Sequence, residues 1–308
     1  MSSQQREKIG FIGLGRMGRP MASNLHKKGF ELLVYDPNPV AVDALRQVGA
    51  RAAADIAQVA RGSDIIITMV PASADVEAIV LGPDGLLDHG HAGQLILDMS
   101  TVDPATTDLI ARRAAARGVS VVDAPVGRLA AHADRGESLF MVGAEKADFE
   151  RVLPLLQAMG TTIFHCGKVG SGTRTKLVNN YFVVVYCQLN AEALALAQSF
   201  GLDLDKTLEV INGTSAFNGQ LRLNWANKVL IGDITPGFTI DLAHKDLSLI
   251  LDAANAAKVP LPVAAAAREM FTLARTTPYG KADFSAMGDF LCELAGVEKP
   301  RISRESRG

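Results

Sequence analysis

Two stretches of the chain combine residue types and spacings that could bind a nucleotide and move a proton. The first, GLGRMG, places Gly13, Gly15 and Gly18 in a G-x-G-x-x-G pattern directly after an apolar run and before a helix-like segment. Such glycines allow a tight turn, let a pyrophosphate approach the backbone and permit close packing of helix on strand. The unpaired N–H groups of the helix that follows would face the phosphates. This context predicts a dinucleotide site rather than a plain glycine turn.

An acidic residue at the end of the next strand-like segment bears on the choice of dinucleotide. Asp36 lies 18 residues after Gly18, where a carboxylate would bond the ribose hydroxyls and repel a 2′-phosphate. No arginine follows it directly, so NAD (as NADH) is favoured over NADP; capping of the next turn is the alternative role for Asp36. Later strand ends should add contacts, since ligands lie at the carboxyl ends of such strands. The predicted cofactor contacts are Gly13, Leu14, Gly15, Arg16, Met17, Gly18, Asp36, Val70, Pro71 and Thr101.

The second stretch, GSGTRTKLVNNYF, opens a long helical segment with a lysine in apolar surroundings. Lys176 and Asn180 are four residues apart and therefore share one helix face. A lysine there is costly to bury without a partner or a task. Beside a bound cofactor it could protonate a carbonyl oxygen as hydride arrives, because desolvation lowers a lysine's pKa toward the range of a useful acid and base. On these residues alone, a lysine that extends its stem toward solvent is an equal alternative.

The elements that must position these residues fall into two groups. Strand-like segments alternate with helix-like ones as far as residue 165, which predicts a doubly wound, parallel α/β sheet of Rossmann type over residues 1–165. The predicted strands are 8–15, 31–36, 51–54, 64–70, 94–100, 119–126, 138–144 and 162–167, and the helices between them are 18–30, 39–50, 55–62, 75–81 and 104–118.

The rest of the chain, residues 166–308, has almost no strand signal and predicts an all-helical domain. Its predicted helices are 173–201, 205–213, 241–258, 260–277 and 283–296. The first of these is apolar nearly all round, which predicts a buried helix that forms the spine of a second domain or a dimer interface.

Composition limits the possible partners. With 308 residues and a net charge of −2 of mixed signs, the chain should form one or two domains, and it gives no reason to expect binding to nucleic acid or an anionic membrane. Its 3 cysteines lie far apart without a C-x-x-C pair, so neither a disulfide framework nor a zinc site is expected. No signal peptide or membrane-spanning run is apparent, and a cytoplasmic location is predicted.

Several motifs, in order, resemble the β-hydroxyacid dehydrogenase family, the relatives of 3-hydroxyisobutyrate dehydrogenase. They are GFIGLGRMGRPMASNL, DMSTV, DAPV, GSGTRTKLVNN and DLAHKDL, and the similarity runs from Lys8 to about Ser285. The resemblance implies that Lys176 is the catalytic lysine, that Asn180 positions the substrate, and that Lys245 lies near the nicotinamide. It also implies a homodimer or homotetramer with contact between helical domains. The predicted substrate contacts are Ser100, Thr101, Gly127, Arg128, Asn179 and Lys245, of which Lys245 is also predicted to contact the cofactor.

The chain departs from this family directly after DAPV. Most members continue with a serine and two glycines that hold the substrate carboxylate, whereas this chain has Gly127, Arg128 and Leu129. The motifs PVGR, NKVL, GDITPGF and IDLAHKDL resemble one branch, whose members reduce a short aldehyde bearing a terminal sulfonate. Arg128 would give such an anion a permanent charge and several N–H donors. A surface arginine in a loop is the alternative.

These features predict an NADH-dependent reductase of a small anionic aldehyde with a terminal sulfonate. The alternative substrate carries a carboxylate: succinic, tartronic or methylmalonic semialdehyde, or the matching hydroxy acid. An imine reductase shares the fold but generally lacks a lysine at the position of Lys176. A non-enzymatic protein, such as a nucleotide-binding sensor or scaffold, would tolerate the loss of Lys176.

Overall fold

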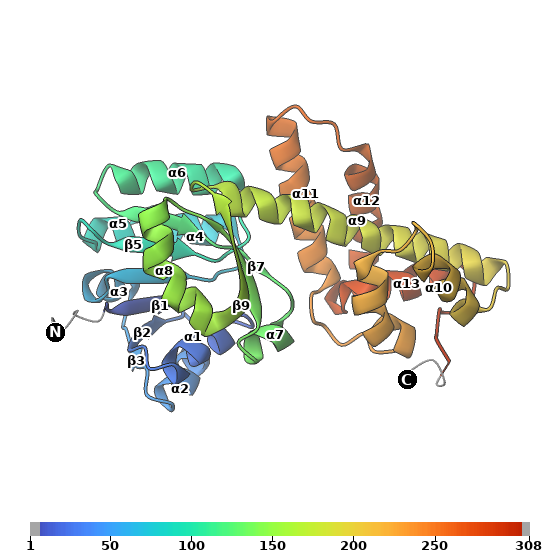
Figure 1. The fold of residues 1–308 in the computed structure, drawn as a ribbon, viewed down its shortest axis with the longest axis horizontal. Helices are drawn as coiled ribbons and strands as arrows, with labels where there is room; N and C mark the ends of the chain where they lie inside the picture. Colours follow the sequence, from blue (N-terminus) through green and yellow to red (C-terminus); the bar gives the residue numbers. More distant parts are fainter. Residues whose placement is uncertain (1–6, 304–308) are drawn as a thin grey trace. The chain divides into compact units, whose positions relative to one another are not determined.

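A computed structural model describes residues 7–303 of the chain. The fold divides into two compact units, Met1–Lys176 and Leu177–Gly308 (Figure 1). Helix α9 (Ser171–Ser199) begins in the first unit and continues in the second. The domain boundary expected between residues 165 and 166 stays a prediction.

The first unit is built on one sheet, and six of its strands run parallel in the order β3-β2-β1-β4-β5-β6. This is the doubly wound Rossmann arrangement that the alternating pattern predicts. The strands are β1 (Ile9–Ile12), β2 (Leu32–Tyr35), β3 (Arg51–Ala52), β4 (Ile65–Thr68), β5 (Leu95–Asp98) and β6 (Ser120–Asp123). The helices that connect them are α1 (Gly18–Lys27), α2 (Pro39–Arg46), α3 (Ile56–Gly62), α4 (Ser73–Leu81), α5 (Leu86–His89) and α6 (Pro104–Ala115).

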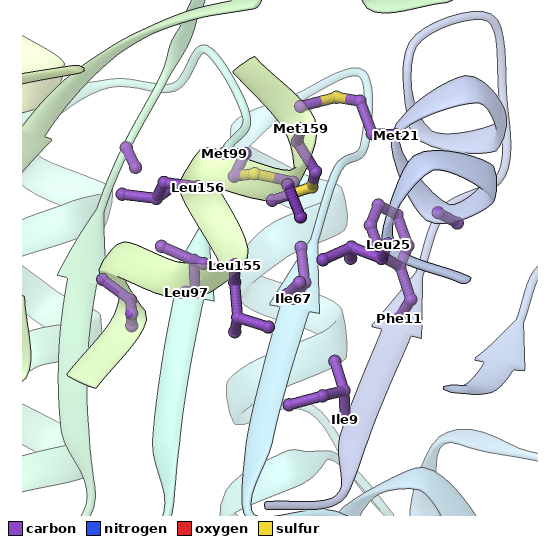
Figure 2. Close-up of a cluster of buried hydrophobic side chains, with 14 of the residues drawn as sticks. Ile9, Phe11, Met21, Leu25, Ile67, Leu97, Met99, Leu155, Leu156 and Met159 are labelled. Atoms are coloured by element: carbon purple, nitrogen blue, oxygen red, sulfur yellow. The ribbon is translucent and has the colours of Figure 1, made fainter. Parts of the chain in front are cut away.

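Both faces of this sheet are buried, which explains why its strands are apolar without alternation. Alternate side chains of β1, β4 and β5 point to opposite faces: Ile9 and Phe11 pack under α1 and α8, whereas Ile66 and Ile96 pack under the helices of the other face. Figure 2 shows the first of these clusters, in which Leu25 of α1 lies above Phe11. The two apolar layers hold the carboxyl ends of the strands in one row.

The sheet is extended beyond β6 by a segment that the sequence pattern described incompletely. It consists of β7 (Val126–Gly127), α7 (Ala130–Asp134), β8 (Ser138–Gly143), α8 (Lys146–Met159) and β9 (Gly160–Gly167). Strand β8 runs antiparallel to β6 and β7, and β9 runs parallel to β8, so the sheet is mostly but not wholly parallel. Helix α8, absent from the predicted elements, is the crossover that two parallel neighbours require.

The second unit is helical, and its core gathers around Trp225, Phe271 and Phe284. Besides α9, its longer helices are α10 (Leu204–Asn212), α11 (Ile240–Ala256), α12 (Pro262–Arg275) and α13 (Met287–Ala295). Short helical turns make up the rest: Gln220–Asn224, Trp225–Asn227, Val229–Ile231, Pro278–Lys281 and Phe284–Ala286.

Helix α9 is not buried all round, contrary to the prediction from its apolar composition. One side packs into the core of the second unit through Val184 and Leu194. The other side exposes Phe182, Leu189 and Leu196, which are 50%, 46% and 54% accessible and follow one another at intervals of seven residues. Helix α9 therefore has two apolar surfaces. The core of the second unit covers one of them, and the other is exposed on the single chain.

Across residues 7–303, no helix is long and apolar enough to cross a membrane. Within the same range, no group of three or more His, Cys, Asp or Glu side chains is arranged to hold a metal ion. The three cysteines, Cys166, Cys187 and Cys292, are free thiols.

Candidate active site

The glycine turn between β1 and α1 has the geometry of a phosphate cradle. Gly13 has φ +93° and faces the Met69 carbonyl, while Gly18 faces the carbonyl of Gly13, so a Cβ at either position would collide with backbone. At Gly15 a Cβ would meet no atom within 4 Å. Backbone is therefore exposed at Gly15, just before α1, where a pyrophosphate would meet the N–H groups at the helix N-terminus. Buried Leu14, exposed Arg16 and half-buried Met17 complete the turn.

Asp36 directly follows β2, and each of its two carboxylate oxygens accepts a backbone hydrogen bond. Its Oδ2 accepts a hydrogen bond from the Leu14 N–H at 2.6 Å, and its Oδ1 accepts one from the Asn38 N–H at 2.8 Å. The carboxylate thus joins the glycine turn to the turn after β2. Each carboxylate oxygen has a second lone pair with which to meet a ribose hydroxyl.

The loops after β4 and β5 are held together by a buried aspartate that the sequence analysis did not single out. Asp98 Oδ1 accepts hydrogen bonds from Thr68 Oγ1 at 2.8 Å and from the Ser100 N–H at 3.1 Å. Ser100 Oγ in turn accepts one from the Val70 N–H at 3.0 Å. Burial raises the pKa of Asp98, although its hydrogen bonds oppose the change. Pro71 and Thr101 follow directly in the two loops.

A second buried aspartate, Asp123 at the end of β6, receives the start of α9. Its two oxygens accept hydrogen bonds from the Gly170 N–H at 2.6 Å and the Thr173 N–H at 2.7 Å. Burial raises the pKa of Asp123, and the same hydrogen bonds oppose that change. Asp123 belongs to the motif DAPV, but its sequence context alone predicted no role for it.

Lys176 lies in α9, and its side chain turns back to the sheet. Its Nζ donates a hydrogen bond to the carbonyl of Val126 at 2.8 Å. The structure therefore brings the ammonium group to strand β7, beside buried Gly127 and the start of the Arg128 turn. This contact differs from that of a lysine whose ammonium only extends into solvent.

Arg128 combines an unusual backbone with an anchored side chain. Its φ of 69° lies in the left-handed region that favours glycine. The guanidinium donates to the Glu137 carbonyl at 2.7 Å, to Thr161 Oγ1 at 3.2 Å and to Thr162 Oγ1 at 3.1 Å. An anionic ligand would have to join or replace these three bonds.

The predicted residues of the second unit form a group joined through side chains. Asn180 Nδ2 donates to Asp246 Oδ2 at 2.5 Å, and Lys245 Nζ lies 3.5 Å from the other oxygen of Asp246. Asn179 Nδ2 donates to Asn180 Oδ1 at 3.1 Å. Buried Asp246 holds two of the three predicted residues, yet the sequence analysis named only its neighbour Lys245.

The glycine cradle, the acidic end of β2 and the bonded loops after β4 and β5 define the class of protein: a dinucleotide-binding protein of the Rossmann type. Comparison with known proteins agrees. Residues 8–167 match the family described as the NAD binding domain of 6-phosphogluconate dehydrogenase. Residues 170–291 match the family described as NAD-binding of NADP-dependent 3-hydroxyisobutyrate dehydrogenase.

Individual relatives extend the match over nearly the whole chain. The chain is 43% identical to 3-sulfolactaldehyde reductase of Escherichia coli over 94% of its length and 97% of that protein. It is 39% identical to 2-(hydroxymethyl)glutarate dehydrogenase of Eubacterium barkeri, over 94% of this chain and 96% of that one. Among solved structures, 3-hydroxyisobutyrate dehydrogenase of Mycobacterium tuberculosis with L-serine superposes with a TM-score of 0.83 at 29% identity, covering 93% of this chain and 99% of that one.

The chain belongs to the 3-hydroxyisobutyrate dehydrogenase-like family of β-hydroxyacid dehydrogenases. It is an enzyme of the NAD-dependent hydroxyacid dehydrogenase and reductase type, and it binds NAD(H). The predicted family, fold class and cofactor are thereby confirmed.

Proposed function

We propose that this enzyme uses NADH to reduce 3-sulfolactaldehyde to 2,3-dihydroxypropane-1-sulfonate. The observation that carries the proposal is Arg128, whose left-handed backbone costs about 1–3 kcal/mol in a residue other than glycine. An arginine kept at such a position supplies a charge and a fork of donors that a glycine could not. The 43% identity to 3-sulfolactaldehyde reductase supports the same substrate.

The chemistry assigned to the residues follows from their contacts. Bound NADH supplies the hydride. Lys176 Nζ donates a proton to the aldehyde oxygen, and the Val126 carbonyl holds that nitrogen in place between turnovers. Aldehyde, NADH and one proton thus give alcohol and NAD⁺.

Substrate and cofactor contacts complete the proposal. Arg128 binds the sulfonate, and Asn180, whose amide is fixed by Asp246, positions the substrate. Asp36 selects NADH over NADPH by bonding the ribose. The remaining proposed substrate contacts are Ser100, Thr101, Gly127, Asn179 and Lys245, and Lys245 also lies near the nicotinamide. Residues 1–165 and 166–308 are the proposed dinucleotide and substrate domains.

The test is the ratio of kcat/KM for 3-sulfolactaldehyde to kcat/KM for succinic semialdehyde, measured with both NADH and NADPH. We expect a ratio above ten with NADH and lower values with NADPH for both aldehydes. A ratio below one would reject the sulfonate substrate and leave the reductase assignment intact.

A carboxylate-bearing substrate is the second candidate, and a specific observation favours it. The Arg128 guanidinium is already bonded to Glu137, Thr161 and Thr162. Should it keep those bonds during turnover, the substrate anion would be held by other groups. Succinic, tartronic or methylmalonic semialdehyde, or the matching 3-hydroxy acid, would then be the substrate.

We also propose a cytoplasmic homodimer or homotetramer. Support for the assembly comes from α9, where Phe182, Leu189 and Leu196 expose a row of apolar side chains that a second copy would cover. The test is light scattering of Leu189→Lys against wild type: a lower mass with NADH affinity retained is expected, whereas an unchanged mass would exclude this surface.

A further inference from the structure

The carboxylate of Asp123 occupies a closely fitted site at the start of the helix that carries Lys176. The residue is 1% exposed, and its two oxygens each accept one backbone N–H, from Gly170 and from Thr173. A Cβ added at Gly143 or Gly172 would collide with Asp123, so glycine is needed on both sides. The carboxylate is therefore packed closely against backbone on both sides.

The two bonds fix one end of the turn that holds the proposed proton donor. Thr173 precedes Lys176 by three residues, about one helical turn. Lys176 Nζ is bonded to Val126, which follows Asp123 by three residues along the run from β6 to β7. Residues 123–126, from the end of β6 to the start of β7, thus hold both the helix turn that carries Lys176 and the ammonium group of Lys176.

Charge favours this arrangement despite the burial. The first N–H groups of a helix carry partial positive charge and stabilise a carboxylate beside them. Asp98 is the register partner of Asp123 on β5, and the charge of Asp123 contributes to the raised pKa of Asp98. The backbone N–H groups of Gly170 and Thr173 thus stabilise Asp123 where burial disfavours its charge.

We propose that Asp123 is a positioning residue for Lys176: it binds the first turn of α9 and so sets where the lysine places its ammonium group. The proposal rests on the proposed proton transfer by Lys176. Asp123 does not touch substrate, because its carboxylate is enclosed by Gly143, Gly170, Gly172 and Thr173.

Asp123→Asn is the informative substitution. An asparagine has one acceptor oxygen and places an NH₂ donor against the N–H of Gly170 or Thr173, so one bond becomes a clash of donors. Displacing a catalytic group by about 1 Å can cost on the order of 100-fold in rate. We expect kcat to fall about 10- to 100-fold while the Kd for NADH stays within twofold of wild type.

A double-mutant cycle with Lys176→Ala separates positioning from general structural damage. If Asp123 acts through the lysine, Asp123→Asn should cost nothing further in the Lys176→Ala enzyme. An equal loss in both backgrounds, or a loss of NADH affinity in parallel with kcat, would overturn the positioning role alone. Near-normal turnover by Lys176→Ala itself would overturn the proposed chemistry and the positioning role together.

Asp108→Asn is the matched control. Asp108 also binds the first turn of α9, through Arg174 at 3.0 and 2.8 Å, but the pair is half exposed and should contribute little. Its kcat should stay within twofold of wild type. If Asp123→Asn does not fold, Asp123→Ser keeps one acceptor oxygen without the clashing amide, and the same selective loss of kcat is expected. A Ser variant with wild-type kcat would refute the proposal.

Discussion

The two units hold their proposed site residues in different ways. In the first unit, Lys176 and Asp36 are anchored by backbone groups: Lys176 bonds the Val126 carbonyl, and Asp36 accepts from the Leu14 N–H. Arg128 is held by one carbonyl and two threonine hydroxyls. In the second unit the anchors are side chains: Asn180 and Lys245 both depend on Asp246. Backbone positions follow from the topology of the sheet and survive most substitutions nearby. The chain of side-chain contacts among Asn179, Asn180, Asp246 and Lys245 (the relay) is broken when one of these residues is replaced.

The largest effect should come from a residue of the backbone-anchored group. Lys176→Ala removes the proposed proton donor but leaves the glycine cradle and Asp36 untouched. We expect kcat to fall about 10²- to 10⁴-fold, with the Kd for NADH near that of wild type by fluorescence titration. A variant within a few-fold of wild-type kcat would remove the lysine from the mechanism.

Arg128 should show the next largest effect, confined to the substrate anion. A charge-assisted hydrogen bond contributes roughly 1.5–3 kcal/mol, so Arg128→Ala should lose about ten- to a hundredfold in kcat/KM for 3-sulfolactaldehyde. Arg128→Lys should recover part of this, because one ammonium cannot reproduce the fork of donors.

The left-handed backbone of Arg128 supplies a control for stability. Arg128→Gly should unfold at a higher denaturant concentration than Arg128→Ala, since glycine adopts a φ of 69° without strain. If both variants keep wild-type kcat/KM for the sulfonate substrate, Arg128 is a surface residue. A carboxylate-bearing substrate then becomes the leading candidate.

In the second unit, replacing Asp246 should lower kcat/KM, because this residue contacts both Asn180 and Lys245. Asp246→Ala removes the partner of Asn180 and Lys245 together, so kcat/KM should fall roughly tenfold. Ser248→Ala, which removes a hydrogen bond of the same helix that involves no proposed site residue, serves as control and should change kcat/KM by less than Asp246→Ala. Equal effects of the two substitutions would show that the relay does not run through Asp246.

The smallest effect is expected at Asp98. The hydrogen bonds from Thr68 Oγ1 and the Ser100 N–H reach the same oxygen, Oδ1, so Asp98→Asn can keep these two bonds and remove a buried ionisable group. Because burial raises the native pKa of Asp98, the native state binds its proton more tightly than the unfolded state does, and the free energy of unfolding falls as pH rises from about 4 through the native pKa.

Asp98→Asn should therefore be more stable than wild type at pH 7. The advantage should disappear below about pH 4, where the aspartate is protonated in both states. Urea unfolding at the two pH values measures this. An advantage that grew on acidification would contradict the burial of an ionised Asp98.

Much of the first unit could be predicted from the sequence because the signals are local. The turn glycines, Asp36 and the apolar strands are recognisable within about thirty residues of one another. Lys176 could be singled out as a polar residue in an apolar helix. Its anchor could not, because the Val126 carbonyl lies 50 residues away along the chain and any residue type supplies a carbonyl.

The site features that could not be predicted from the sequence depend on contacts between segments that are far apart along the chain. Asp123 meets Thr173 across 50 residues, and Asn180 meets Asp246 across 66. Strand β8 gave a correct strand signal, but nothing in its composition distinguishes an antiparallel neighbour from a parallel one. Helix α8 carries apolar residues at helical spacing, including Val152 and Leu156, but Pro154 interrupts the pattern.

The reach of these contacts along the chain bears on the order of folding. The pairing of β1 with β4 joins Ile9 to Ile65, and the start of α9 joins Asp123 through Thr173, so the two loops that must close are of similar length. The entropy of closing a loop depends only weakly on its length. During refolding, NADH binding and activity should therefore recover together, because neither the glycine turn nor the anchor of Lys176 has a clear advantage in loop closure.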